Sequence, residues 1–251
     1  MDDLFGGTTA PADLPFRLPE GDSYATRWNA ALRGFDVDVP DGAFFYAEAF
    51  FSRAVSDRVI DYFQENDSID WRSARWRDVD ADSLERIRFA NIAWKQDRIS
   101  MYGKQMPLPR LTSWYGDAGR SYTYSGITSH PNPWNKGLLH LKEKIEACAG
   151  AHFNSVLLNW YRDGDDHLSW HADDEQELGR NPIIASANFG EIRDFVIRRN
   201  DDPAAKIVLP LGHGTLLVMK GALQHFWQHA VPKRKAVKGS RFNLTFRRIL
   251  D

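Results

Sequence analysis

The sequence predicts a mainly β protein with flanking helices, that is, an α+β chain whose strands form an antiparallel sandwich or jelly roll. Two observations predict this class. After Gly150, short apolar runs typical of strands follow one another, separated by turn residues such as Asp163-Gly164. No helical pattern lies between these runs, which disfavours a parallel sheet of β–α–β units. The predicted strands cover residues 153–161, 183–189, 192–199, 206–211, 214–220 and 240–249.

Two helices are predicted before the strands. From Ser52 onward, apolar residues recur at helical spacing as far as Phe63, with Ser52 or Ser56 as the N-cap. The second helix is expected over residues 133–148, because its apolar residues share one face and Gly150 supplies a stop. Residues 1–20 lack periodicity and are expected to form a flexible tail. The remainder, residues 21–251, is expected to be a single domain, with an N-terminal extension over 21–150 and a strand-rich core over 151–251.

The composition is that of an ordinary globular domain. Of the 251 residues 43% are apolar, and 32 basic residues nearly balance 34 acidic ones, for a formal charge of −2. The whole molecule therefore has no general attraction for nucleic acid, and such binding has to rest on local clusters of cations. No apolar run approaches the roughly 18 residues needed to span a bilayer, and no secretion signal is expected at the N-terminus.

Cys148 is the only cysteine of the chain. A single cysteine can form neither an internal disulfide nor a thiolate zinc cluster, so any metal must be bound by nitrogen and oxygen ligands. The absence of disulfides favours a reducing compartment, and we expect the protein in the cytoplasm.

One face of the last predicted strand is polar along its whole length. Alternation places Arg241, Asn243, Thr245 and Arg247 on this face and apolar side chains on the other. Two guanidinium groups suit the bidentate capture of carboxylate or phosphate groups if the face lines a cavity. An exposed face of a sheet would show the same alternation, so the strand alone leaves both interpretations open.

The strand expected over residues 153–161 carries a second polar pair. Asn159 and Tyr161 share one face of an otherwise apolar run. Polar groups in such a run need hydrogen-bond partners. They either satisfy neighbouring backbone groups or complete a ligand site.

His171-Ala172-Asp173 is the only His-x-Asp sequence in the chain. Residues i and i+2 at a strand end can present an imidazole and a carboxylate to one metal ion, although such a pair is also common on polar surfaces. A second histidine would complete the facial triad of non-haem Fe(II) oxygenases, which leaves coordination positions open for a cosubstrate and dioxygen. His229 is the candidate; His213 and His225 compete with it on spacing alone.

Together these motifs resemble the AlkB family of Fe(II)- and 2-oxoglutarate-dependent dioxygenases, and among its members those that repair duplex DNA. The resemblance covers the chain from about Met101 to Leu250. The motifs that carry it, in the family's order, are Tyr115-Gly116-Asp117-Ala118-Gly119, Tyr122-Thr123-Tyr124-Ser125-Gly126, Asn159-x-Tyr161, His171-Ala172-Asp173-Asp174-Glu175, His229 and Arg241-x-Asn243-x-Thr245-x-Arg247.

The resemblance implies a double-stranded β-helix, or jelly roll, that holds Fe(II) through His171, Asp173 and His229. It implies that the cosubstrate 2-oxoglutarate binds beside the iron, with Arg247 at its chelating end and Arg241 at its distal carboxylate. The residues expected around 2-oxoglutarate are Asn159, Tyr161, Arg241, Asn243, Thr245 and Arg247. The implied reaction consumes dioxygen and 2-oxoglutarate, hydroxylates an N-methyl group, and releases formaldehyde, succinate and carbon dioxide.

The substrates implied by the resemblance are 1-methyladenine and 3-methylcytosine in DNA, and a base inside a duplex must leave the stack to be oxidised. We expect aromatic stacking and hydrogen bonding to this base from Tyr122, Tyr124, Ser125, Asp174 and Glu175. Met101 and Tyr102 are expected at the tip of a hairpin that fills the gap left by the base. Phosphate contacts are expected from Arg110, Arg198, Arg199, Lys233, Arg234, Lys235 and Lys238.

One departure from the duplex-repairing members bears on the substrate. The connection Asn200-Asp201-Asp202-Pro203 is short and acidic, where those members have a longer basic loop. Single-stranded DNA and RNA therefore stay open as substrates beside duplex DNA. Two further alternatives are an oxygenase of the same chemistry that acts on a protein or small molecule, and a jelly-roll binding module without catalysis. We expect a monomer without membrane association.

Overall fold

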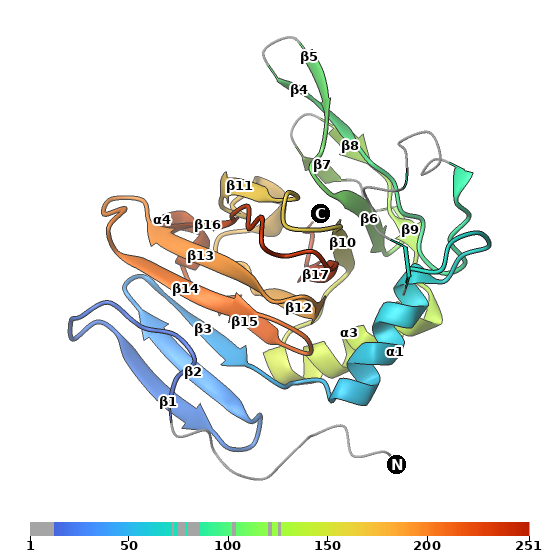
Figure 1. The fold of residues 1–251 in the computed structure, drawn as a ribbon. Helices are drawn as coiled ribbons and strands as arrows, with labels where there is room; N and C mark the ends of the chain where they lie inside the picture. The colour runs from blue at the N-terminus through green and yellow to red at the C-terminus, as the bar shows by residue number, and fades with distance from the viewer. Residues whose placement is uncertain are drawn as a thin grey trace.

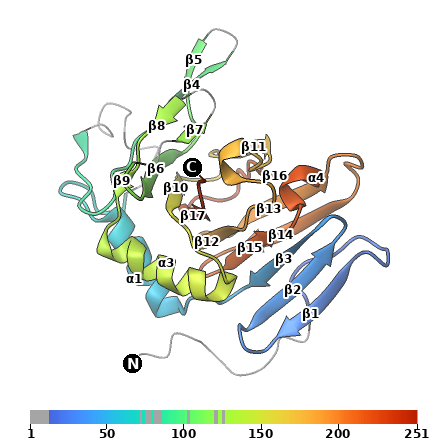
Figure 2. The same ribbon diagram turned by 180° about the vertical axis from the view of Figure 1, so that it is seen from behind.

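Two β-sheets pack face to face, and two helices cover the outer face of the larger sheet (Figures 1 and 2). The structure is a computed structural model, and it describes residues 13–71, 73–74, 79, 86–101, 104–119, 122–124 and 127–250. The strands of the nine-stranded sheet are, in spatial order, β1 (Ala25–Asn29), β2 (Gly34–Val39), β3 (Gly42–Ala47), β15 (Leu216–Lys220), β12 (Ile184–Gly190), β17 (Arg241–Arg247), β10 (Ser155–Tyr161), β6 (Leu111–Gly116) and β9 (Asn132–Pro133).

The smaller sheet has four strands and faces the middle of the larger one. Its strands are, in spatial order, β11 (Leu168–His171), β16 (Trp227–Val231), β13 (Arg193–Arg199) and β14 (Lys206–Leu211). Two separate hairpins, β4–β5 (Arg98–Met101 and Lys104–Pro107) and β7–β8 (Tyr122–Tyr124 and Ile127–Ser129), project together from one end of the molecule in both views (Figures 1 and 2). The fold is the jelly roll with flanking helices that the sequence predicts, and every strand predicted after Gly150 is present.

The two longer helices begin at side chains that accept hydrogen bonds from their first backbone N–H groups. Helix α1 (Arg53–Gln64) follows Ser52, whose hydroxyl accepts a hydrogen bond from the Val55 N–H at 3.4 Å. Helix α3 (Lys136–Ala149) begins three residues later than predicted, because Asn135 is its N-cap and Pro133 pairs in β9. Within the described part of the chain, two further short helices are η2 (Gln176–Leu178) and α4 (Leu223–Phe226). Among the described residues, no helix combines the length and apolarity needed to cross a bilayer.

Alternation along the central strands separates an aromatic core from a polar interior. Phe242, Leu244 and Phe246 of β17 are fully buried between the larger sheet and the helices. Trp160 of the neighbouring β10 packs on Phe242 with ring centroids 4.8 Å apart. The opposite faces of both strands point between the two sheets, and they carry the polar residues considered below.

The N-terminal part of the chain is integrated into the same core. β3 pairs with β15, and β6 pairs with β10, so the larger sheet crosses the boundary expected at residue 150. Part of the segment expected as a flexible tail is packed as well: Phe16 is 8% exposed, and its ring lies 5.1 Å from that of Tyr46. The reason is that the apolar residues of β2 and β3 need a cover on this side of the sheet, which Phe16 helps to provide.

Candidate active site

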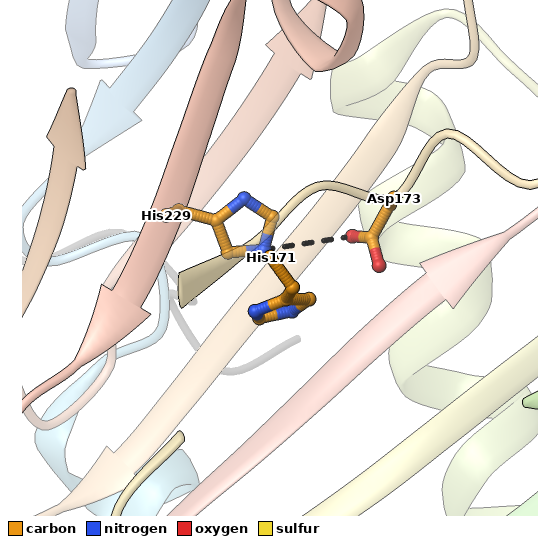
Figure 3. A group of neighbouring side chains, drawn as sticks. All are labelled: His171, Asp173 and His229. Atoms are coloured by element: carbon orange, nitrogen blue, oxygen red, sulfur yellow. Dashed lines mark ion pairs between the residues drawn. The ribbon is translucent and has the colours of Figure 1, made fainter. Parts of the chain in front are cut away.

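Two histidines and an aspartate meet at the open edge of the smaller sheet (Figure 3). β11 and β16 pair antiparallel with His171 directly opposite His229, and a register irregularity lies between Leu168 and His171. Asp173 follows two residues after His171, just beyond the end of β11. Potential ligand atoms of the three side chains lie within 4.8 Å of one another, and the Nε2 atom of His229 is 3.8 Å from an Asp173 carboxylate oxygen.

Each of these three side chains is held by further contacts. Asp173 is 2% exposed, and its Oδ1 atom accepts a hydrogen bond from Arg247 Nη2 at 2.6 Å. The His229 ring stacks on Phe195 with centroids 4.9 Å apart. His171 Nδ1 lies 2.9 Å from the Ser169 carbonyl oxygen. Because a carbonyl only accepts, Nδ1 of His171 carries the proton and Nε2 retains the lone pair that a metal needs.

The electrostatic environment keeps two of the potential ligands, His229 and Asp173, deprotonated. Burial, together with the nearby His171 imidazole, lowers the pKa of His229 to about 3. Burial alone would raise the pKa of Asp173, but the Arg247 guanidinium and the two imidazoles outweigh it and hold this pKa below its ordinary value. At neutral pH His229 therefore presents an unprotonated imidazole nitrogen and Asp173 a carboxylate, which are the states that bind a divalent metal.

The competing histidines are engaged elsewhere. Nδ1 of His213 accepts a hydrogen bond from the Gly190 N–H at 3.1 Å, and its Nε2 lies 3.1 Å from Asp57 Oδ1. His225 contacts the carbonyl oxygen of Arg180 through its Nε2 atom. The donor set of His171, Asp173 and His229, two nitrogens and one oxygen, fits the facial triad of an Fe(II) oxygenase.

A cavity of about 570 Å³, including its open mouth, begins at this cluster and runs between the two sheets. The polar faces of β10 and β17 predicted from alternation both line it. Its lining residues are Arg110, Leu157, Asn159, Tyr161, Leu168, His171, Asp173, Ser186, Phe195, Met219, His229, Val231, Arg241, Asn243, Thr245 and Arg247. The structure thus brings the six residues expected around 2-oxoglutarate into one cavity with the candidate metal ligands.

The contacts of Arg241 indicate whether this cavity fits a dicarboxylic acid. It is 2% exposed, its Nη2 atom donates to Asn188 Oδ1 at 2.6 Å, and its guanidinium lies over the Tyr161 ring at 5.0 Å. Burial lowers its pKa to about 10, so the group is still cationic at neutral pH. Its Nε and Nη1 atoms are buried without a hydrogen-bond partner among the described residues. Buried unpaired donors are costly, and a carboxylate bound to the guanidinium would pair with at least one of these nitrogens.

Three asparagines form a hydrogen-bonded ladder, and two of them, Asn159 and Asn243, line the cavity. Asn159, Asn243 and Asn188 stand opposite one another on the adjacent strands β10, β17 and β12. Asn159 Nδ2 donates to Asn243 Oδ1 at 3.2 Å, and Asn243 Nδ2 donates to Ser186 Oγ at 2.8 Å. Asn188 and Ser186 were not predicted as site residues. The sequence could have identified them, because they form a polar pair at positions i and i+2 of the apolar run 183–189. Asn159 and Tyr161 were predicted as site residues from the same pattern.

Two of the residues expected to bind phosphate, Arg110 and Arg199, already have partners within the protein. Arg110 is 4% exposed and donates to Asn159 Oδ1 at 2.9 Å, so it lies on the cavity wall and not on an outer surface. Arg199 is engaged by two carboxylates, at 2.6 Å from Asp201 and 2.8 Å from Asp41. Both were assigned from charge alone, which does not reveal where a side chain points.

The residues expected at the methylated base are only partly covered by the structure. Asp174 is exposed, whereas Glu175 is half-buried and its Oε2 atom has no hydrogen-bond partner among the described residues. The backbone of Met101 lies in β4, and that of Tyr122 and Tyr124 in β7. Tyr102 and Ser125, which complete the expected wedge and base slot, lie outside the described residues. The roles of these residues at the base stay predictions.

Comparison with known families gives the class of protein. Residues 76–247 match the family model described as the 2OG-Fe(II) oxygenase superfamily. The chain therefore belongs to this superfamily of oxygenases, whose cofactor and cosubstrate are Fe(II) and 2-oxoglutarate. The His171, Asp173 and His229 cluster and the unpaired nitrogens of Arg241 fit these two groups.

Similarity to individual relatives identifies the family within this superfamily. Alpha-ketoglutarate-dependent dioxygenase alkB homolog 3 of Bos taurus is 45% identical over 179 residues, which are 68% of this chain and 62% of that protein. DNA oxidative demethylase ALKBH2 of Homo sapiens is 44% identical over 160 residues, or 61% of each chain. ALKBH2 of Mus musculus is 41% identical over 160 residues, which are 61% of this chain and 67% of that protein. Within the superfamily, the chain belongs to the AlkB family, and it spans about 61 to 67% of the length of these relatives.

Proposed function

We propose that this protein oxidatively removes methyl groups from 1-methyladenine and 3-methylcytosine in DNA. The observation that carries the proposal is that His171, Asp173 and His229 converge in a cavity that is also lined by the buried Arg241. The relatives named DNA oxidative demethylase, at 41 to 44% identity, support DNA as the substrate class. RNA is the second candidate substrate, because the acidic connection over residues 200–203 weakens the case for strict duplex recognition.

His171 and His229 would bind Fe(II) through their Nε2 atoms, and Asp173 through one carboxylate oxygen. Bound Fe(II) supplies the activation of dioxygen and the oxidative decarboxylation of 2-oxoglutarate. The protein's own contribution is to fix the ligands and to keep the cavity closed to bulk water. Phe195, which stacks on His229, contributes to both, because it fixes the imidazole plane and lines the cavity.

The two arginines would orient 2-oxoglutarate between them. Arg247 lies next to Asp173, so it is placed to bind the carboxylate nearest to the metal. The unpaired nitrogens of Arg241 are placed for the distal carboxylate. Tyr161 beneath the Arg241 guanidinium and the asparagine ladder would support the chain of the cosubstrate between these ends.

The methylated base would approach from the metal side of the cavity. Glu175 is the best-placed acceptor for an exocyclic amine, because its Oε2 atom has no hydrogen-bond partner among the residues described. Asp174 would be a second acceptor, and Tyr122, Tyr124 and Ser125 would stack on and bind the base. Met101 ends β4 of the hairpin that projects beside β7–β8 (Figure 1), and together with Tyr102 it would fill the gap that the base leaves.

An assay on methylated oligonucleotides tests the proposal. The full chain is incubated with Fe(II), ascorbate, 2-oxoglutarate and an oligonucleotide that contains 1-methyladenine or 3-methylcytosine, as single-stranded DNA, duplex DNA and RNA in parallel. We expect formaldehyde and restored bases with at least one of the two DNA substrates, and neither product with the Asp173→Ala variant. Succinate formed with another substrate, without base restoration, would favour the alternative of an oxygenase for a protein or small molecule.

The alternative of a non-catalytic binding module makes a different prediction, because such a module forms no succinate with any substrate.

We retain a monomer and a cytoplasmic location as further predictions. They rest on the composition of the chain and its single, buried cysteine Cys148.

A further inference from the structure

A buried glutamine from a neighbouring element contacts the candidate metal carboxylate residue through its backbone. Gln224 is 1% exposed and lies in the short helix α4, directly before β16. Its Oε1 atom accepts a hydrogen bond from the Asp173 N–H at 3.0 Å. Its Nε2 atom donates to the sulfur of Met219 at 3.3 Å, so both polar ends of the amide are satisfied.

This contact acts on a residue that no strand ladder fixes. Asp173 lies two residues beyond His171, the last residue of β11, where regular pairing with β16 has ended. Arg247 holds one end of Asp173 through its Oδ1 atom, and Gln224 holds the other end through its backbone N–H. With both ends held, the Oδ2 atom is left facing Nε2 of His229 at 3.8 Å.

The helix that carries Gln224 is itself anchored. The Asn200 side chain donates to the His225 carbonyl at 3.0 Å, and the Asn200 N–H donates to the Phe226 carbonyl at 2.9 Å. Trp227, which follows the helix and begins β16, donates from its indole to the Pro40 carbonyl at 2.9 Å. Gln224 therefore ties the Asp173 loop to the helix that leads directly into β16, the strand that carries His229.

We propose that Gln224 is a positioning residue of the metal site: it fixes the backbone at Asp173 so that only the Oδ2 atom of the carboxylate is presented to the ion. This inference rests on the proposed role of Asp173 as a ligand. Outer partners that orient metal ligands contribute about 10- to 100-fold to metal affinity in comparable sites. Loss of the Gln224 acceptor is therefore expected to weaken metal binding without touching any ligand atom.

The experiment measures metal binding, with no turnover required. Co(II) affinity and the visible absorption of bound Co(II) are determined for the full chain, for Gln224→Met, which retains the size of the side chain but not the amide acceptor, and for Leu223→Met. The last variant is the matched control, because it changes a buried neighbour of Gln224 in α4 that does not line the cavity and leaves the bond to Asp173 in place. We expect about 10-fold weaker binding or more and an altered spectrum for Gln224→Met, and binding within threefold of the parent for Leu223→Met.

A Gln224→Met affinity within threefold of the parent would overturn the inference, and so would an equal loss in both variants. If Gln224→Met does not fold, hydrogen exchange of the Asp173 amide is measured in the metal-free parent instead. Slow exchange supports the inference, and exchange at the rate of an open loop overturns it. Asp173→Ala separates this result from the proposed function. If that variant still binds Co(II) like the parent, the ligand assignment fails, whereas unchanged binding by Gln224→Met alone removes only the role of Gln224.

Discussion

Asp173, Arg241 and Arg247 are charged residues that are 2%, 2% and 9% exposed, and their burial governs the site at the residue scale. A buried charge is tolerated when another charge or a set of hydrogen bonds compensates it. Arg247 compensates Asp173 directly, whereas Arg241 has one short bond to Asn188 and two nitrogens left for a ligand. The unsatisfied part of this network therefore marks where the cosubstrate would bind.

Replacement of Arg241 by lysine is expected to weaken cosubstrate binding. The planar guanidinium presents two donors to one carboxylate, and a lysine ammonium cannot reproduce this fork. We expect about 10-fold weaker binding of N-oxalylglycine to the Mn(II)-loaded protein, or roughly 1.4 kcal/mol, measured by calorimetry.

Arg193→Lys is the matched control for this experiment. Arg193 is also buried and lies over the Tyr161 ring, at 5.9 Å, but it donates to the backbone carbonyls of Asp163, Asp166 and Pro232 and does not line the cavity. Its variant is expected to bind N-oxalylglycine within twofold of the parent. An equal loss in both variants would contradict the role of Arg241.

The metal-free protein is expected to lose stability as the pH falls from 7 to 5, in part through His229. This imidazole has an ordinary pKa of 6.5, and burial lowers the pKa in the folded state to about 3. Between these values the unfolded chain binds more protons than the folded one, so the free energy of unfolding decreases with decreasing pH. The contribution of this group approaches about 1.4 kcal/mol per pH unit. Urea unfolding of the parent and of His229→Asn at several pH values measures this contribution. An identical pH dependence of stability in both proteins would refute the role of His229.

At the scale of elements, the sequence predicts the long regular strands and fails for the short ones that carry the metal ligands. β10, β12 and β17 have alternating or continuous apolar runs, and all three were predicted. β11 has four residues, half of them exposed, so it offers no period to detect. The ligands on β11 and β16 were found from residue type and family spacing instead. The pairing that brings His171 opposite His229 is non-local, and no local pattern encodes it.

Gly150 is expected to contribute to stability through its backbone conformation alone. It ends α3 with φ of 64°, in the left-handed region, and its N–H donates to the Glu146 carbonyl. A Cβ atom at this position would meet nothing within 4 Å, so no clash adds to the effect. Gly150→Ala is therefore expected to lower the free energy of unfolding by about 1 kcal/mol in urea titrations. Gly150→Asn is expected to lose less, because asparagine tolerates this region; an equal loss for both would point to another cause.

At the scale of the whole molecule, the two hairpins stand at one end and the helices cover the outer face of the larger sheet (Figures 1 and 2). The formal charge of −2 provides no overall attraction for a phosphate backbone. Of the predicted phosphate contacts, Arg110 is buried in the cavity, Arg199 is engaged by carboxylates, and Arg198 donates to Gln228 and lies over the Trp170 ring. The other predicted cations all lie in the loop after β16 and are exposed: Lys233, Arg234, Lys235 and Lys238.

The salt dependence of oligonucleotide binding is expected to reside largely in this loop. Each phosphate contact contributes about 0.7 to the slope of log affinity against log salt for a single strand, so replacement of Lys233, Lys235 and Lys238 by glutamine is expected to reduce the slope by about 2. Fluorescence anisotropy with a single-stranded oligonucleotide at several salt concentrations measures it. Glutamine at Lys136 of α3 and Lys206 of β14, both exposed, is the control and is expected to leave the slope unchanged. If the loop variant keeps the parental slope, the nucleic acid crosses another face, and the hairpins become the place to search for its cationic contacts.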